Sequence, residues 1–144
     1  MVSAFGIISV IVLIIFIPGL ITLKSLLNLR EKLDSSLDLC ESIARLLLDM
    51  YNDSALDVNN TEILDLCTKG VEGDFKVLIK IVNRIYKIEH TLFFTEDEYE
   101  IISKTREELK TAADDYSAAV GKYNSFLDKP LGKLAAGLTG MVKV

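Results

Sequence analysis

The side chains best suited to acid–base or metal chemistry lie close together beyond the middle of the chain. His90 is the only histidine, Glu89 directly precedes it, and acidic residues are dense across Glu96–Glu100. Successive residues of a helix point about 100° apart, so Glu89 and His90 cannot share a metal ion. The acidic residues predict either a weak cation site or the solvated start of a helix, where the helix dipole favours negative charge. The helix start is the interpretation we favour.

Other signatures of catalysis are absent from the sequence. It has no Cys-x-x-Cys pair, no Gly-Lys-Ser/Thr loop and no Gly-x-Ser-x-Gly motif. Gly70 and Gly73 lack the third glycine and the preceding strand of a dinucleotide-binding fingerprint. Cys40 and Cys67 each fall in an apolar-periodic stretch, which is typical of buried, reduced thiols. We therefore predict a protein that is not an enzyme and that has no cofactor and no metal site.

A long apolar run opens the sequence, and no charged side chain interrupts it from Val2 to Leu23. About 20 helical residues cover the roughly 30 Å of hydrocarbon in a bilayer, so the run predicts a transmembrane helix. A cleaved signal peptide is the alternative, but the run has neither a basic start nor a small-residue cleavage site. Pro18 and Gly19 lie near one end of the span, where they can kink it.

The distribution of charge predicts an orientation and a set of partners. Lys24, Arg30 and Lys32 follow the span, and no basic residue precedes it. The positive-inside tendency then places the N-terminus outside a cell membrane and the rest of this single-pass protein in the cytoplasm. The formal net charge of -5 argues against nucleic acid as a partner. The predicted partners are the lipid bilayer, a membrane or cytoplasmic protein, and further copies of the chain.

Three amphipathic stretches follow the span, each with apolar residues repeating every three or four positions. The first runs from residue 24 to 52 and ends in the turn formers of "YNDSALDVNN". The second runs from residue 60 or 61 to 93 with a heptad-like, coiled-coil rhythm. The third begins with a capping box formed by Thr95 and Glu98, and it must stop at Pro130.

The sequence therefore predicts an all-α protein. The transmembrane helix continues into an antiparallel three-helix bundle, with four helices as the alternative if the second breaks at Gly70–Gly73. The predicted parts are the span at residues 2–23, the bundle at 24–130 and an apolar, glycine-rich tail at 131–144. In an up-down-up bundle the third helix ends far from the bilayer. The tail then reaches lipid only if the bundle lies down on the membrane.

The last third of the chain, "DDYSAAVGKYNSFLDKPLGKLAAGLTGM", resembles the LemA family of bacterial membrane proteins. Family members show Asp-Tyr-Asn, then Ala-Val, then Tyr-Asn seven residues after the first tyrosine. A Phe-Pro and a run ending in Ala-Gly-Leu-Phe-Gly-Phe follow. The segment "SLLNLREKL" is similar to the Leu-Arg-Glu segment after the family's membrane helix. The residues at corresponding places are Asp115, Tyr116, Ala119, Val120, Tyr123, Asn124, Pro130, Ala136, Gly137, Leu138 and Gly140.

The chain also departs from the family pattern. Ser117 replaces the first asparagine, Lys87 replaces a proline after Tyr86, and the phenylalanine before Pro130 is missing. The resemblance is thus to a shortened, divergent member. It implies a membrane-anchored helical bundle, and it implies no enzymatic activity because none is established for the family.

Two features of the C-terminal third are candidate binding surfaces. Tyr116 and Tyr123 are seven residues apart and share one helix face, which predicts either core tyrosines or a docking ladder. The leucines of the tail share one side if the tail is helical. That side either packs over the end of the bundle or binds a partner protein or the membrane surface. The candidate partner-binding residues are Tyr116, Tyr123, Asn124, Leu131, Leu134, Leu138 and Met141.

These observations favour a membrane-anchored helical scaffold that presents its bundle near the membrane face and has no catalytic activity. A homo-oligomeric structural membrane protein, with the tyrosine face buried between copies, is the alternative. A cation-binding protein or an enzyme that uses the Glu96–Glu100 cluster is a more distant alternative.

Overall fold

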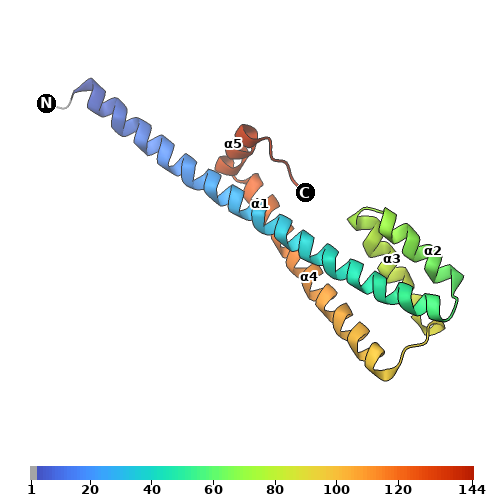
Figure 1. Ribbon diagram of the computed structural model, residues 1–144. Helices are drawn as coiled ribbons and strands as arrows, with labels where there is room; N and C mark the ends of the chain where they lie inside the picture. Colours follow the sequence, from blue (N-terminus) through green and yellow to red (C-terminus); the bar gives the residue numbers. More distant parts are fainter. Residues whose placement is uncertain (1–2) are drawn as a thin grey trace. The chain divides into compact units, whose positions relative to one another are not determined.

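The computed structural model describes residues 3–144, and within that range it contains helices and short connections but no strand (Figure 1). The all-α prediction is confirmed. The predicted span begins at Val2, which lies outside the described residues. The elements are α1 (Ala4–Asp57), α2 (Thr61–Glu72), α3 (Phe75–Ile88), the 3-10 turn η1 (Glu89–Thr91), α4 (Glu96–Asp128) and α5 (Pro130–Thr139).

The chain divides into two compact units, and both α1 and α4 contribute to each. The span unit consists of Met1–Ser35 with Tyr116–Val144, and the acidic unit consists of Ser36–Asp115. The span unit carries seven lysines and arginines against three aspartates and glutamates, a formal charge of +4. The acidic unit carries nine against eighteen, a formal charge of -9. The net charge of -5 is therefore the sum of a basic unit that contains the apolar run and an acidic unit.

Helix α1 is a single helix of 54 residues, and its first part contains the apolar run. This helix is long and apolar enough to cross a membrane, and none of its most apolar window is buried. Pro18 lies inside the helix without ending it. The hydroxyl of Thr22 donates a hydrogen bond to the carbonyl oxygen of Pro18 at 2.8 Å, which pairs this polar side chain within the helix itself.

The predicted end of the first helix near residue 52 is wrong, because α1 continues to Asp57. Tyr51 and Ala55 are fully buried in the core, so packing overrides the local turn preference of the sequence. After Asp57 the chain turns away at Asn59, which has a left-handed φ of 53° that asparagine tolerates better than most residues. Asn60 caps α2 by accepting a hydrogen bond from the backbone N–H of Ile63 at 3.1 Å.

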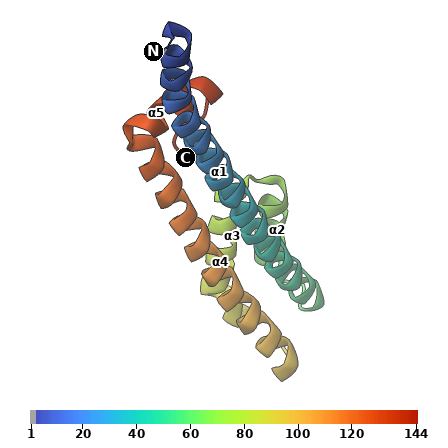
Figure 2. The ribbon, with the colours of Figure 1, turned by 90° about the vertical axis from the view of Figure 1, so that its left-hand side faces the viewer.

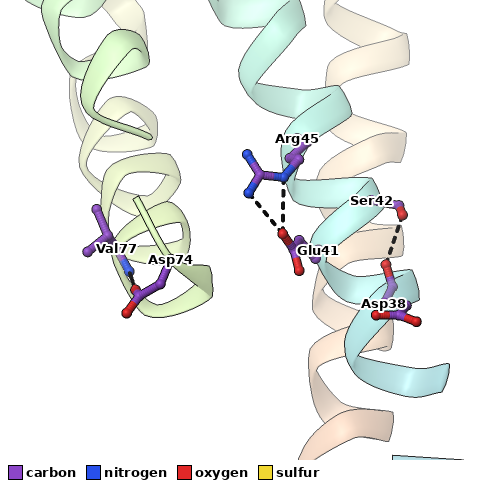
Figure 3. Close-up of polar contacts among 6 residues, drawn as sticks. All are labelled: Asp38, Glu41, Ser42, Arg45, Asp74 and Val77. Atoms are coloured by element: carbon purple, nitrogen blue, oxygen red, sulfur yellow. Dashed lines mark hydrogen bonds and ion pairs between the residues drawn. The ribbon is translucent and has the colours of Figure 1, made fainter. Parts of the chain in front are cut away.

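The second predicted helix is broken, as in the four-helix alternative. Gly73 is extended, and Asp74 caps α3 by accepting a hydrogen bond from the backbone N–H of Val77 at 3.0 Å (Figure 3). The buried face of α2 consists of Ile63, Leu66, Cys67 and Gly70. Val71, which the heptad-like rhythm places in the core, therefore has an exposed side chain.

The acidic unit has a continuous apolar core. The short antiparallel hairpin of α2 and α3 packs against the second half of α1, and the first half of α4 completes the cluster. Thr95 caps the start of α4 as predicted, since its Oγ1 accepts a hydrogen bond from the backbone N–H of Glu98 at 3.2 Å. The fully buried side chains of this core include Cys40, Ala44, Leu47, Tyr51, Ala55, Ile63, Leu78 and Ile85.

The span unit has its own smaller core, in which the last turns of α4 and the following α5 pack beside α1 (Figures 1 and 2). Ala135 of α5 belongs to the same buried cluster as Leu26 of α1, which is three residues past the end of the apolar run at Leu23. The prediction that the tail ends far from the span is therefore wrong. The second stretch folds as a short hairpin, so it is α4 that runs back along α1 and brings the tail with it.

The two cysteines are free and buried, and burial raises the pKa of the Cys67 thiol to about 11. A thiol in the unfolded chain ionises near pH 9, whereas the folded protein keeps Cys67 protonated until about pH 11. Because the folded pKa is raised, the stabilisation is complete below pH 9 and is lost as the pH rises. We expect the free energy of unfolding to fall by about 1 kcal/mol between pH 8 and pH 10 from this group.

The measurement is amide hydrogen exchange in α2 and α3 across that pH range, after correction for the intrinsic exchange rate. Cys67→Ala removes the titrating group, so its stability, although lower throughout, should fall by about 1 kcal/mol less over the same interval. Parallel curves for the two proteins would contradict this assignment.

Candidate functional site

The tyrosine predicted as part of a docking ladder is a core residue of the span unit. Tyr123 is fully buried, and its hydroxyl donates a hydrogen bond to the carbonyl oxygen of Val142 at 3.0 Å. The guanidinium carbon of Arg30 lies 5.5 Å from the centre of its ring, within range of a cation–π interaction. The side chain therefore fixes the tail to α4 and is inaccessible to a partner in this structure.

Three more of the predicted binding residues also hold the tail. Asn124 makes two hydrogen bonds to Val144: its amide nitrogen donates to the carbonyl oxygen at 2.9 Å, and its Oδ1 accepts from the backbone N–H at 3.0 Å. Tyr116 and Met141 are half-buried and pack against the core of the span unit. Lys143 adds an ion pair with Asp128 at 2.5 Å.

The remaining three predicted residues form an exposed surface on α5. Leu131, Leu134 and Leu138 are 53%, 63% and 79% exposed, and their spacing of three and four places them on one side of the helix. We call these three residues the leucine face. Monomeric surfaces rarely concentrate large apolar side chains on a short helix without a contact to make. Of the seven predicted residues, these are the ones available for binding.

A tight corner between α4 and α5 sets the position of the leucine face. Pro130 occupies the first turn of α5, where a missing N–H costs nothing. At Gly132 the backbones of α4 and α5 approach so closely that a Cβ atom would lie 1.9 Å from the backbone oxygen of Phe126. The helix ends at Gly140 with a left-handed φ of 71°, which favours glycine.

The acidic unit contains a polar network that the sequence pattern did not predict. Glu89 accepts a hydrogen bond from the hydroxyl of Tyr51 at 2.9 Å and forms an ion pair with Arg106 at 3.3 Å. The guanidinium carbon of Arg106 also lies 4.4 Å from the centre of the Tyr86 ring. Burial and the Glu89 hydrogen bond raise the pKa of Tyr51, so its hydroxyl stays protonated and continues to donate.

A groove of about 560 Å³ lies between α3 and α4, beside this network. Asn83 and Lys110 line it together with Arg106, over an apolar floor that includes Val82 and Leu109. The Nε and Nη2 atoms of Arg106 are buried and make no hydrogen bond within residues 3–144, and Nη2 keeps its ion pair with Glu89. These two shielded atoms face away from the groove's solvent, and the charge partner of Arg106 is Glu89.

No sequence signal could have joined these network residues. Tyr51, Glu89 and Arg106 come from three different elements, and Glu89 is 38 positions away from Tyr51. They meet because η1, which follows the α2–α3 hairpin, places Glu89 beside Tyr51 of α1 and Arg106 of α4. Such a contact depends on tertiary packing alone.

The residues first considered for acid–base or metal chemistry do not form a centre. Glu89 contacts Tyr51 and Arg106, whereas His90 is exposed to solvent. The acidic residues Glu96–Glu98 occupy the exposed first turn of α4. Within residues 3–144, no three or more His, Cys, Asp or Glu side chains are grouped so that they could hold a metal ion.

The fold and these surfaces define an all-α protein in which one long helix combines an apolar run, suited to crossing a membrane, with the cores of two packed units. Comparisons with protein-family models, with curated proteins and with solved structures find no match.

Proposed function

We propose that this protein is a membrane-anchored helical scaffold without catalytic activity, which presents its acidic unit in the cytoplasm. The observation that carries the proposal is the exposure of α1. Every large apolar side chain from Phe5 to Ile21 is between 50% and 80% exposed, although the same helix is buried in a core further along. In water this surface would be strongly unfavourable, whereas a bilayer would cover it on all sides.

The basic character of the span unit supports the proposed orientation. Besides Lys24, Arg30 and Lys32, four lysines from α4, α5 and the tail belong to this unit. Positive charge beside a span favours the cytoplasmic side. The N-terminus is then outside and the acidic unit is in the cytoplasm, where its formal charge of -9 gives it no attraction to anionic lipid.

The resemblance to the LemA family belongs to this proposal as well. The residues that carry it have identifiable structural roles at the corner between α4 and α5. Tyr123 and Asn124 hold the tail, Pro130 begins α5, and Gly140 ends it in a left-handed conformation. A sequence pattern that encodes this corner would be retained by a scaffold, since the corner supports a surface and contains no catalytic group.

A topology experiment tests the proposal with the full-length chain in right-side-out membrane vesicles. The native thiols are buried, so a cysteine introduced at Ser3 or at the exposed Val71 provides the reactive thiol. We expect a membrane-impermeant maleimide to label Ser3→Cys in sealed vesicles. It should label Val71→Cys only after the vesicles are permeabilised. The unmodified chain is the control for the native cysteines.

Two results would contradict the proposal. Labelling of Val71→Cys in sealed vesicles would show that the orientation is the opposite of the proposed one. Release of the protein from the vesicles by alkaline carbonate would show that α1 does not cross the bilayer.

A further inference from the structure

We propose that α5 is an interfacial helix whose leucine face inserts into the cytoplasmic surface of the same bilayer that α1 crosses. This inference rests on the proposed membrane anchoring and adds a second, peripheral contact with lipid. The occupant of the leucine face is thus a lipid surface that carries anionic headgroups.

Helix α5 packs beside the end of the apolar run. Ala135 packs in one cluster with Leu26, and Leu26 follows the last residue of the apolar run by three positions, about one helical turn. A helix anchored at that point lies at the level where a transmembrane segment leaves the hydrocarbon. The leucine face is therefore carried by a helix that packs about one turn past the end of the apolar run.

Helix α5 has one buried side and one exposed side. One side holds Gly132 and Ala135, small residues that are buried against the rest of the span unit. The other side carries the leucine face, which is mostly exposed. Burying an apolar side chain of this size is worth about 1.5–3 kcal/mol when it is complete, so three leucines can hold a short helix at an interface.

The side chains around the leucine face are basic. Lys129 and Lys133 flank Leu131, and both are exposed, as are Lys24 and Lys32 on α1. The span unit has a formal charge of +4, whereas the acidic unit has -9. An interfacial helix combines apolar insertion with basic side chains among anionic headgroups, and each basic side chain near such a surface adds about 1 kcal/mol. This complementarity favours anionic lipid over a second copy of the same basic unit.

The segment that follows α5 is held in place by contacts within the span unit. The hydrogen bonds from Tyr123 to Val142 and between Asn124 and Val144 fix the segment that follows α5. Gly132 allows α5 to approach the α4 backbone closely. The leucine face is thus presented by a supported helix, which lowers the ordering cost of insertion.

The experiment uses the full-length chain reconstituted in vesicles of phosphatidylcholine, with or without phosphatidylglycerol. Leu138→Cys is labelled with an environment-sensitive fluorophore, and spin-labelled lipids serve as quenchers. Val71→Cys is the matched control, because Val71 is an equally apolar, exposed residue in the acidic unit. We expect several-fold stronger quenching at position 138 than at position 71, and stronger quenching with phosphatidylglycerol than without it.

Replacing Lys129 and Lys133 by glutamine should reduce the effect of phosphatidylglycerol on that quenching. Equal quenching at positions 138 and 71, in protein that resists carbonate extraction, would overturn the interfacial helix and leave the anchoring intact. Carbonate release of the protein would instead contradict the anchoring. A blue shift at position 138 that depends on protein concentration and not on the spin-labelled lipids would assign the leucine face to a second copy of the chain, and would overturn the lipid contact.

Discussion

Replacing Glu89 by alanine is expected to destabilise the acidic unit by about 2–4 kcal/mol. The substitution removes the acceptor of the Tyr51 hydroxyl and leaves the Arg106 cation without its ion pair. Glu89 and Arg106 retain 17% and 20% side-chain exposure, so water screens part of the loss and the full cost of a buried, broken pair does not apply. Amide hydrogen exchange in α2 and α3 should become roughly 30-fold to 1,000-fold faster.

Two further variants separate the contributions to this effect. Glu89→Gln keeps an oxygen acceptor for Tyr51 but removes the charge, so we expect a smaller loss, of about 1–2 kcal/mol. Combining Glu89→Ala with Arg106→Met removes both ions, and the loss should fall below the sum of the single losses by about 1–3 kcal/mol. If Glu89→Ala changed the free energy of unfolding by less than about 0.5 kcal/mol, the network would not contribute to the stability of the acidic unit.

The substitution Gly132→Ala is expected to detach α5 from the corner that positions it. The new Cβ would lie 1.9 Å from the backbone oxygen and 2.9 Å from the backbone carbon of Phe126. Backbone atoms inside a helix cannot rotate away as a flexible side chain can, so α5 itself must move. We expect a local cost of about 2–3 kcal/mol, which corresponds to exchange in α5 that is roughly 30-fold to 150-fold faster.

Gly137→Ala is the matched control for this prediction, since it places the same methyl group on the same helix. A Cβ at Gly137 meets nothing within 4 Å. Alanine in a helix is favoured over glycine by about 1 kcal/mol, so exchange in α5 should stay the same or become slower. Similar acceleration by both variants would show that helix composition, and not the close approach at Gly132, governs the stability of α5. Exchange in the acidic unit should be unchanged in both proteins.

The sequence alone determined the helical class and most of the element boundaries that depend on local chemistry. Apolar residues every three or four positions predict helices because one side of a helix must be buried. Thr95 and Asn60 are caps whose side-chain oxygens accept hydrogen bonds from nearby backbone N–H groups. Pro130 cannot continue α4 because proline has no backbone N–H. The apolar run of α1 is equally local, since length and composition suffice to identify it.

Tertiary structure alone decided how far α1 extends and where the tail lies. The segment after Met50 is rich in turn formers, yet Tyr51 and Ala55 are held in the core and keep it helical. The break at Gly73 shortens the second stretch into two helices, and α4 consequently carries the tail back to Leu26. Periodicity cannot report such outcomes, because it describes which side of a helix is apolar and not which helix covers it.

The candidate site divides in the same way. The spacing of Leu131, Leu134 and Leu138 predicts one apolar side of a helix, and the structure leaves that side exposed. The seven-residue spacing of Tyr116 and Tyr123 was compatible with an exposed face as well as a buried one, and the structure buries Tyr123. Local spacing is encoded in the sequence because neighbouring residues of a helix have a fixed geometry. Whether a given side is covered depends on residues far away in the chain, and the approach of those residues is fixed only when the whole chain packs.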